Sequence, residues 1–476
     1  MRYERILNYP RWVSAAVMIV SLAGATQELE EVRVVGRGQP LTTEERSASE
    51  GTRGQMDLAI RPLLRPGDVL EAIPGLIVTQ HSGSGKSNQL FLRGFNLDHG
   101  TDFSTAIDGM PVNLPSHGHG QGYTDINFLI PETVQRMDYV KGPYHAELGD
   151  FSSAGGVSIQ TFDALPTHRL SLGLGGNGFF RALAMGTSVV ADTDLTGAFE
   201  VQSYDGPWTD IREDVGKING LLKVAGGNDV RSWSVTGMYY DNTWNSADQI
   251  PERAVTRGLI GPLTSLDTSL GGASRRASLS TRYVHNGSCA RSEWHGYAID
   301  YALNLWSNFT YLLDDPLQGD QFQQRDERRI FGGGYDRGWR SGADAQFSHR
   351  VGSTLRFDNI ATVGLYRTQN RRRTGVVRED SVDQLSASVF YELSWQLAAS
   401  WRGVVGVRGD HYRFDVVADD AVNSGSRSDA IVSPKVSLIY TLSSSADAYL
   451  SAGYGFHSND ARGTTIRRDP VSGAAC

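Results

Sequence analysis

The segment Arg231–Tyr239 has the sequence RSWSVTGMY and alternates with a period of two residues. Its odd-numbered positions from 233 to 239 carry Trp, Val, Gly and Tyr, whereas the even-numbered positions from 232 to 236 carry Ser, Ser and Thr. Successive side chains of a β-strand point to opposite faces, so this pattern predicts a strand with one apolar and one polar face. Leu397–Val407 and Ala448–Phe456 alternate in the same way, and each is expected to form a strand.

Similar segments recur from Asp163 to the C-terminus, separated by clusters of Gly, Asn, Asp and Ser. Alternating segments of about ten residues with aromatic residues near their ends are typical of transmembrane β-barrels. Soluble β-sandwiches and propellers also contain alternating strands. The strands of soluble sheets are usually shorter, about five or six residues, so the length of these segments favours a transmembrane β-barrel.

The composition agrees with a mostly β protein and excludes several other classes. The chain has 476 residues, including 54 Gly, 9% aromatic residues and 2 Cys. Glycine shows no three-residue period, which excludes collagen, and two cysteines cannot form a disulfide framework. Beyond the N-terminus, no stretch approaches the roughly 18 apolar residues of a membrane-spanning helix, so a helical membrane protein is excluded.

The first 25 residues have the order of a cleaved secretory signal peptide. Arg2, Arg5 and Arg11 precede the apolar run 12–25, which ends in Ala-Gly-Ala. This pattern predicts export from the cytoplasm. Removal of three Arg and one Glu with this segment would move the net charge from −8 to −10. An acidic exported protein cannot neutralise phosphates, so no nucleic-acid partner is expected.

Residues 26–50 are polar around one short alternating island, Leu29–Gly36. The island has strand character but no neighbouring strands with which to pair. Such a segment can add itself to the edge of a partner's sheet through main-chain hydrogen bonds. A simple linker that happens to carry valines is the alternative.

Residues 51–163 are expected to form a small α+β domain between this arm and the barrel, which would occupy 164–476. Val69–Ile73, preceded by Pro66-Gly67-Asp68, predicts one or two helical turns that end at Pro74-Gly75. A second helix is expected at Thr124–Phe128. Strands are expected at four places, namely Leu76–Thr79, Gln89–Arg93, Ser104–Ile107 and Val134–Val140.

Two local patterns in this domain resemble ligand sites, namely a phosphate loop and a group of histidines. The stretch Gly83–Ser87, GSGKS, fails the phosphate-loop pattern because position 80 is Gln and strand-like residues follow, so an exposed Gly/Ser loop is expected. Five of the eleven histidines lie between 81 and 145. His117 and His119 would project to the same side of an extended segment. With His99 they form a hypothetical metal site, whereas a polar loop decorated with His is the alternative.

The sequence contains no recognisable catalytic set. There is no nucleophile-elbow motif, zinc-protease motif or paired-cysteine spacing. Neither an enzymatic activity nor a cofactor is therefore expected.

Five stretches of the small domain, in order and at family-like spacing, resemble the plug of TonB-dependent outer-membrane receptors. They are Asp68–Gly75, Leu92–Phe95, Ile107–Val112, Val140–Pro143 and Gly155–Val157. The island before this domain resembles the TonB box, and Gly453–Gly463 resembles a strand-and-loop motif of the family's barrel. The resemblance implies a periplasmic partner, TonB, that binds the box as an added strand, namely at Glu30, Glu31, Val32, Arg33, Val34 and Val35.

The resemblance also implies an outer-membrane importer that binds a small ligand at its plug loops and does no covalent chemistry. Clustered His and Asp favour a metal chelate such as a siderophore complex, with cobalamin or an oligosaccharide as alternatives within the family. A secreted β-rich enzyme or carbohydrate-binding protein is the alternative outside it. The implied ligand-binding residues are His81, Asp98, His99, Asp102, His117, His119 and Tyr123. The implied structural motif comprises Arg93, Gly94, Asp108, Gly109, Lys141, Gly142, Gly155 and Gly156.

The predicted barrel is short for this family. Plugged transporters of this kind have about 22 strands, whereas roughly 14 candidates follow residue 163. The chain also ends in SGAAC at 472–476 rather than on an apolar strand with a terminal aromatic residue. The barrel is therefore expected to be incomplete at its C-terminal end.

Overall fold

The computed structural model describes residue 47 and residues 49–342 and 346–476. The chain divides into two units, Met1–Pro40 and Leu41–Cys476, and all described residues belong to the second. The predicted signal peptide at 1–25 and the predicted TonB box at 30–35 lie outside the described residues. Within the described residues, no helix is long and apolar enough to cross a membrane.

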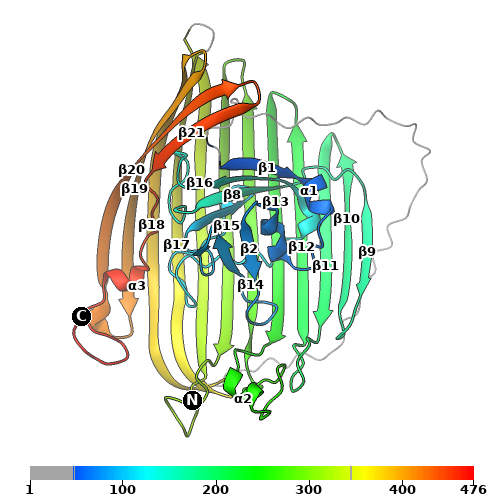
Figure 1. Ribbon diagram of the computed structural model, residues 1–476, viewed down its shortest axis with the longest axis vertical. Helices are drawn as coiled ribbons and strands as arrows, with labels where there is room; N and C mark the ends of the chain where they lie inside the picture. Colours follow the sequence, from blue (N-terminus) through cyan, green and yellow to red (C-terminus); the bar gives the residue numbers. More distant parts are fainter. Residues whose placement is uncertain (1–46, 48, 343–345) are drawn as a thin grey trace. The chain divides into compact units, whose positions relative to one another are not determined.

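The N-terminal part of this unit, residues 50–161, forms two small sheets with short helical segments and is called here the N-terminal domain (Figure 1). Its elements are β1 (Glu50–Gly54), α1 (Gln55–Ala59), η1 (Pro66–Ala72), β2 (Leu76–Thr79), β3 (Gln89–Leu92), β4 (Phe95–Asn96), β5 (Phe103–Ile107), β6 (Met110–Pro111), η2 (Pro131–Thr133), β7 (Val134–Lys141) and β8 (Gly155–Thr161). One sheet has the order β1-β7-β8-β5-β6 and the other the order β2-β3-β4. The pair β5–β8 is parallel, whereas the other pairs in these sheets are antiparallel.

The expected elements of this domain are confirmed with one exception. The helical turn is η1, and the four expected strands are β2, β3, β5 and β7. The helix expected at Thr124–Phe128 is wrong, because the chain there is a turn without helix. The carboxylate of Asp125 accepts a hydrogen bond from the backbone N–H of Asn127 at 2.8 Å, and this local bond replaces helical pairing.

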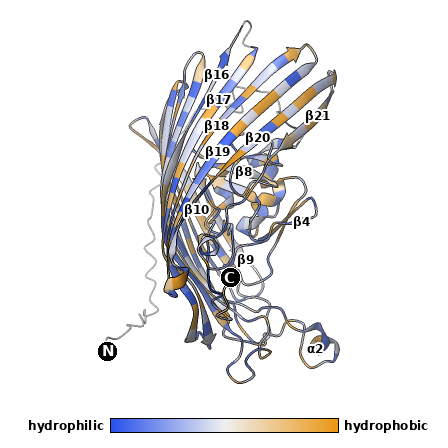
Figure 2. Ribbon diagram, turned by 90° about the vertical axis from the view of Figure 1, so that its left-hand side faces the viewer, coloured by the Kyte–Doolittle hydropathy of each residue, from blue (hydrophilic) through white to orange (hydrophobic). Residues whose placement is uncertain are grey.

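The remainder of the unit is one antiparallel sheet of 13 strands, called here the wall, which curves around the N-terminal domain (Figure 2). The sheet is a meander in which each strand pairs with its neighbours in sequence. Its strands are β9 (Arg169–Leu174), β10 (Phe180–Val190), β11 (Thr193–Tyr204), β12 (Val215–Gly227), β13 (Arg231–Asn245), β14 (Gly271–Asn286), β15 (Ala290–Ser307), β16 (Phe322–Ser341), β17 (Phe347–Gln369), β18 (Arg372–Ala398), β19 (Trp401–Ala418), β20 (Gly425–Ser443) and β21 (Ala446–Gly453). Three short helical segments lie in its connections or after it, namely α2 (Glu252–Thr256), η4 (Ala421–Asn423) and α3 (Ala461–Thr464).

The wall contains 13 strands where roughly 14 were expected. The strand expected at Leu397–Val407 is wrong as a single element, because residues 399 and 400 form a turn between β18 and β19. A register shift between Gln396 and Ala398 keeps the odd-numbered residues on the same face of both strands. The period-two pattern therefore continues through the turn, so the sequence gives no sign of where β18 ends and β19 begins.

The two faces of the wall differ in polarity, as the alternating sequence predicts. In β12, Lys217, Asn219 and Lys223 are buried against the N-terminal domain, whereas Ile218 and Leu222 on the opposite face are 46% and 56% exposed. A sheet with a polar inner and an apolar outer face is the pattern of a membrane-spanning barrel wall.

The two ends of the wall differ in the length of their connections. At one end the strands are joined by short turns, such as 191–192, 228–230, 287–289 and 399–400. The other end carries the long connections 246–270 and 308–321, and Figure 1 shows the first of these with α2 at the lower end of the sheet. In outer-membrane barrels, short turns face the periplasm and long loops face the exterior.

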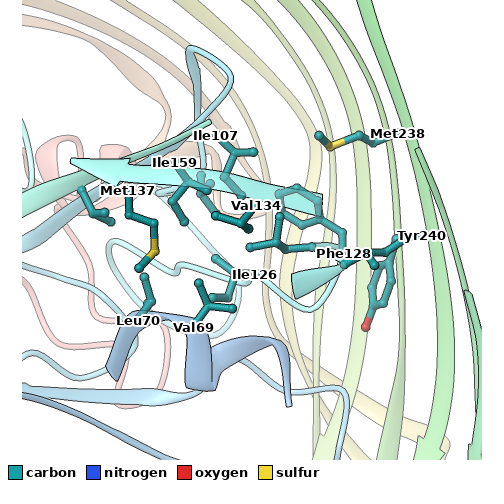
Figure 3. Packing of buried hydrophobic residues seen from close by; sticks show 14 of the residues in the cluster. Val69, Leu70, Ile107, Ile126, Phe128, Val134, Met137, Ile159, Met238 and Tyr240 are labelled. Atoms are coloured by element: carbon teal, nitrogen blue, oxygen red, sulfur yellow. The ribbon is translucent and has the colours of Figure 1, made fainter. Parts of the chain in front are cut away.

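The N-terminal domain shares a hydrophobic core with the inner face of the wall (Figure 3). Phe128 of the domain lies beside Tyr240 of β13, and Ile126 and Met238 belong to the same core; each of these four side chains is at most 6% exposed. This shared core means that the domain is packed within the curve of the sheet.

The loop Gly83–Ser87 is not exposed, contrary to the expectation from its Gly/Ser composition. Four of its five residues are buried, and the loop packs against Trp244 of β13. A Cβ atom at Gly85 would lie 2.1 Å from Cε3 of Trp244. Glycine is therefore required here because the backbone approaches the indole ring closely.

We expect Gly85→Ala to lower the free energy of unfolding by about 1–3 kcal/mol, because the added methyl group overlaps Trp244. Thermal unfolding followed by tryptophan fluorescence measures this change. Gly197→Ala is the matched control, since nothing lies within 4 Å of a Cβ atom there. In the Trp244→Ala background, where the indole ring is absent, Gly85→Ala should lower the free energy of unfolding by less than it does in the wild type. Equal stability of Gly85→Ala and the control would contradict the account.

Candidate functional site

Four histidines and a tyrosine from three loops of the N-terminal domain form one cluster, called here the histidine cluster. Its members are His81, His99, His117, His119 and Tyr123. The ring centroids of His81 and His99 are 5.0 Å apart, and those of His99 and His119 are 4.7 Å apart. His117 stacks on Tyr123 with a centroid distance of 4.2 Å and an interplanar angle of 6°. The structure therefore brings together residues that are up to 42 positions apart in sequence.

The cluster lies toward the long connections of the wall. Ser82, next to His81, donates to the carboxylate of Asp248 at 3.2 Å, and Asp248 belongs to the connection 246–270. His119 contacts Gln324 at the start of β16, directly after the connection 308–321. The loops that carry the cluster thus face the end of the wall that is exterior in outer-membrane barrels.

His117 is fully buried and has protein partners at both ring nitrogens. Its Nδ1 accepts a hydrogen bond from the backbone N–H of His119 at 3.1 Å. The neutral ring therefore carries its proton on Nε2, which lies 3.3 Å from the hydroxyl oxygen of Tyr301 and 3.8 Å from Asp326. The network thus fixes the tautomer and orientation of this ring.

His99 and His119 present an unprotonated Nε2 atom. His99 donates through Nδ1 to the carbonyl oxygen of Asn88 at 3.3 Å, and His119 donates through Nδ1 to Oε1 of Gln324 at 2.7 Å. In a neutral imidazole the other nitrogen is then an acceptor. The lone pairs on these two Nε2 atoms can therefore accept a hydrogen bond or bind a metal.

Lys86 lies within this cluster and is only 4% exposed. Its Nζ atom donates to Nε2 of His81 at 3.1 Å. The ammonium group has three N–H donors, and His81 occupies one of them. Burial lowers the pKa of Lys86, while the nearby carboxylates of Asp248 and Asp98 oppose that shift. A buried ammonium group with spare donors is therefore the chemical centre of the site.

The cluster keeps its histidines neutral. Burial lowers the pKa of His81 and of His99 to about 4, and the positive charge of Lys86 adds to the effect. Burial also lowers the pKa values of His117 and His119 well below the usual range, with Arg328 acting on the first and Lys86 on the second. At neutral pH the four imidazoles are therefore polar but uncharged groups around one cation.

The segment 116–120 is held between the wall and α3. Oγ of Ser116 donates to Gln384 of β18 and accepts from the backbone N–H of Ala461. The N–H of Gly118 donates to Asp326 at 3.0 Å. A Cβ atom at Gly118 would lie 2.6 Å from the carbonyl oxygen of Arg325, so glycine is needed for this contact. These bonds explain why His117 and His119 project into the cluster rather than into solvent.

The two predicted carboxylate ligands lie at the margin of this arrangement. Asp98 has a side chain that is 53% exposed, with Oδ1 at 3.6 Å from Nε2 of His99. Asp102 contacts His457 at 3.2 Å, in the segment after β21. The described residues contain no group of three or more His, Cys, Asp or Glu side chains placed to hold a metal ion. Direct metal binding by His99, His117 and His119 stays a prediction.

The residues of the predicted structural motif lie at turns and strand junctions of the N-terminal domain. The Asp108 carboxylate accepts from the backbone N–H and the hydroxyl of Thr161 at 2.9 and 2.6 Å, and it lies 3.2 Å from Nζ of Lys223 in β12. Lys141 donates to the carbonyl oxygen of Pro74 at 3.1 Å, and Gly156 packs on Ser104. Positive φ angles occur at Arg93, Gly94, Asp108, Gly109, Gly142 and Gly155.

Several residues of the site are absent from the sequence-based prediction. Lys86 lies in the stretch GSGKS, whose composition predicts an exposed loop. Tyr301, Gln324 and Asp326 come from strands of the wall that are about 200 positions away in sequence, as the contacts with the 116–120 segment show. No local pattern in one sequence connects such positions.

Comparison with known families gives two matches that together cover most of the described chain. Residues 45–157 match the family model described as the TonB-dependent receptor plug domain. Residues 216–471, more than half of the chain, match the model described as the TonB-dependent receptor-like β-barrel.

Solved structures with a similar fold include three transporters or receptors at low sequence identity. The copper transporter OprC is 18% identical with a TM-score of 0.65, and the match covers 86% of this chain. The ferric citrate transporter FecA, in its unliganded form, is 14% identical with a TM-score of 0.71 and 88% coverage. The ferric yersiniabactin uptake receptor FyuA from Yersinia pestis is 14% identical with a TM-score of 0.67 and 85% coverage. The matched region covers 64% of each of these three chains.

The neutral state of His99 predicts a dependence of stability on pH. Its pKa in the folded protein is about 4, against 6.5 in a model peptide. Between these values the unfolded chain binds more protons than the folded chain, so the free energy of unfolding falls as pH drops from 6.5 to 4. For one such group the full effect is on the order of 3 kcal/mol.

We therefore expect the variant His99→Gln to lose less stability than the wild type between pH 7 and pH 5 in thermal unfolding. The test compares variants because burial also raises the pKa values of Asp125 and Asp150 to about 6. Protonation of these two carboxylates raises the free energy of unfolding as pH falls, which opposes the effect of His99. His168→Gln, at an exposed position, serves as the control. An identical pH dependence in His99→Gln and the wild type would contradict the assigned neutral state.

Proposed function

Because the chain belongs to the family of TonB-dependent outer-membrane receptors, we propose that it binds an anionic metal chelate at the histidine cluster and imports it. Receptors of this family are transporters rather than enzymes, and they are β-barrel proteins of the outer membrane. The alternative of a secreted enzyme or carbohydrate-binding protein therefore does not hold. The N-terminal domain corresponds to the plug of the family.

The observation that carries the proposal is the buried ammonium group of Lys86 among neutral imidazoles. Burying a charge is costly, and the carboxylates of Asp248 and Asp98 offset only part of the effect of burial on Lys86, so this position favours a ligand that brings further negative charge. Carboxylate or phenolate oxygens of a chelate can accept the spare N–H donors of Lys86 in charge-assisted hydrogen bonds. The imidazoles and Tyr123 add neutral hydrogen-bonding and stacking surface without adding charge.

The same arrangement favours a chelate over a bare metal cation. A free divalent ion at the two available Nε2 atoms would experience repulsion from Lys86, whereas an anionic complex would be attracted. Neutral ligands such as an oligosaccharide would add no negative charge to that of Asp248 and Asp98 near the ammonium group. The structurally similar ferric citrate transporter carries such an anionic complex by name, and this supports the proposal.

We further propose that TonB supplies the energy for import through residues Glu30–Val35. The segment precedes β1, the edge strand of the five-stranded sheet of the N-terminal domain. An alternating segment outside the domain can pair with a partner strand through main-chain hydrogen bonds. Force applied there would reach the N-terminal domain through the chain that leads into β1.

Lys86→Gln should weaken the binding of ferric citrate, used as a small anionic chelate, by about tenfold or more. The substitution removes a charge-assisted hydrogen bond of about 1.5–3 kcal/mol while preserving approximate side-chain length. Equilibrium binding of radioactive ferric citrate to the full chain in outer-membrane vesicles measures the effect. Lys141→Gln makes the same chemical change outside the cluster and should bind like the wild type. Equal binding by Lys86→Gln and the wild type would refute the site, and so would an equal loss of binding in Lys141→Gln and Lys86→Gln.

Deletion of Glu30–Val35 should abolish uptake of ferric citrate into cells but leave binding at the surface unchanged. The reason is that the segment transmits energy and does not touch the ligand. Uptake at 37 °C and binding to cells without an energised inner membrane separate the two steps. Uptake at the wild-type rate would show that this segment is not the contact for TonB.

A further inference from the structure

Arg276 of β14 is a buried cation of the inner wall that the proposed site does not use. Its side chain is 4% exposed, and its guanidinium carbon lies 4.2 Å from the ring centroid of Phe128. Its Nε and Nη2 atoms are buried without a hydrogen-bond partner in the part of the chain that the structure describes. Leaving a buried charged donor unpaired costs more free energy than leaving a neutral one unpaired. Phe128 compensates part of this cost through the cation–π contact.

Polar side chains surround Arg276 on the same wall. In the strand register Tyr240 lies opposite Arg276, Asn242 lies opposite Ser274, and Asn219 lies opposite Tyr240. The Ser274 hydroxyl interacts with Asp125 and the Asn242 side chain with the Tyr240 hydroxyl, whereas Oδ1 of Asn219 has no partner among the described residues. Buried polar groups in native proteins are nearly all paired, so the unpaired nitrogens of Arg276 are the donors of this patch that are available to an anionic ligand.

The nearest acidic group does not form an ion pair with Arg276. Burial raises the pKa of Asp125 to about 6 even though the charge of Arg276 lowers it. The Asp125 carboxylate accepts from the backbone N–H of Asn127 at 2.8 Å. Across the described residues, no carboxylate is ion-paired with the Arg276 guanidinium group within 4.0 Å, so the charge of Asp125 acts on Arg276 only from a greater distance.

The patch adjoins the histidine cluster. Arg276 lies opposite Tyr301 in the register of β14 and β15, and the Tyr301 hydroxyl lies 3.3 Å from Nε2 of His117. Phe128 covers the patch from the side of the N-terminal domain, and Figure 3 shows it next to Tyr240. A displacement of the segment 123–130 would uncover the guanidinium group toward the interior of the wall.

We propose that Arg276, with the hydroxyl groups of Tyr240 and Ser274, is a second binding station for the oxyanion groups of the imported chelate. This inference rests on the proposed function. The station is closed by Phe128 in the resting protein and opens when the N-terminal domain moves during transport. A guanidinium group presents parallel N–H donors that fit a carboxylate in a bidentate manner, and the hydroxyl groups supply further donors. The ligand thus passes from Lys86 to Arg276 without losing a cationic partner.

Arg276→Met keeps the apolar stem that packs on Phe128 but removes the charge. We expect it to bind ferric citrate at rest within about twofold of the wild type, while its uptake rate falls about tenfold or more. Arg276→Lys keeps the charge and should retain a larger fraction of uptake than Arg276→Met. Wild-type uptake by Arg276→Met would overturn the proposal. Equal loss in both variants would show that only the shape of arginine matters, which also overturns the role of charge.

Phe128→Ala tests the same station without transport. Removal of the ring uncovers Arg276 in the resting protein, so the purified full chain should gain a second site for free citrate in titration calorimetry. The double variant Phe128→Ala/Arg276→Met should lose that site. Failure to gain a site contradicts the proposal.

The two proposals fail separately. Normal resting binding by Lys86→Gln refutes the histidine cluster as the first site but leaves the citrate titration of Phe128→Ala as a test of Arg276. Normal uptake by Arg276→Met refutes the second station alone.

Discussion

The structure depends on the pairing of charges that the wall turns inward. In β10, Arg181 donates two hydrogen bonds to Glu132 of the N-terminal domain, at 2.7 and 2.9 Å, and also pairs with Glu200 of β11. In β12, Lys223 lies 3.2 Å from Asp108. The outer face of the same strands carries apolar side chains, so the charges cannot turn outward. Removing one partner of such a buried pair leaves an uncompensated charge and costs several kcal/mol. The N-terminal domain is therefore held in one position by the polarity of the wall.

This position determines where a ligand can bind. With the domain fixed, its loops meet the long connections of the wall, and Lys86 lies among neutral histidines next to Asp248. Many inward charges of the wall pair with the N-terminal domain, with a neighbouring strand or within their own strand, as Arg181, Lys217 and Arg408 do. Arg276 is different, because its guanidinium group faces an aromatic ring and its Nε and Nη2 atoms have no hydrogen-bond partner among the described residues. The distribution of satisfied and unsatisfied charges thus separates residues that hold the domain from residues that are available to a ligand.

Much of the fold could be predicted from the sequence because strand periodicity is a local property. The alternation in Arg231–Tyr239 corresponds to β13, and the plug-like stretches correspond to elements of the N-terminal domain. Local patterns failed where distant residues decide the structure. The loop at Gly85 is buried because Trp244 packs on it, and the helix expected at Thr124–Phe128 is replaced by a turn that packs against the wall. The turn at residues 399–400 was hidden because the alternation continues through it.

The site could be predicted only in part for the same reason. The histidines between 81 and 119 stood out in the sequence, and the structure places them together. The role of Lys86 and the contribution of Tyr301 depend on a sheet whose strands are far away in the chain. Tyr301 reaches His117 only because the N-terminal domain is packed inside the wall.

The most direct test of the account is the location of the metal in crystals of the full chain soaked with ferric citrate, from anomalous scattering at the iron edge. The account predicts iron next to the histidine cluster, with citrate oxygens between the metal and Nζ of Lys86, and no direct bond from iron to an imidazole. Iron bound directly to His99 or His119, at the distance of about 2.0–2.2 Å typical of a metal–imidazole bond, would contradict it. Iron at a position remote from Lys86 would contradict it as well.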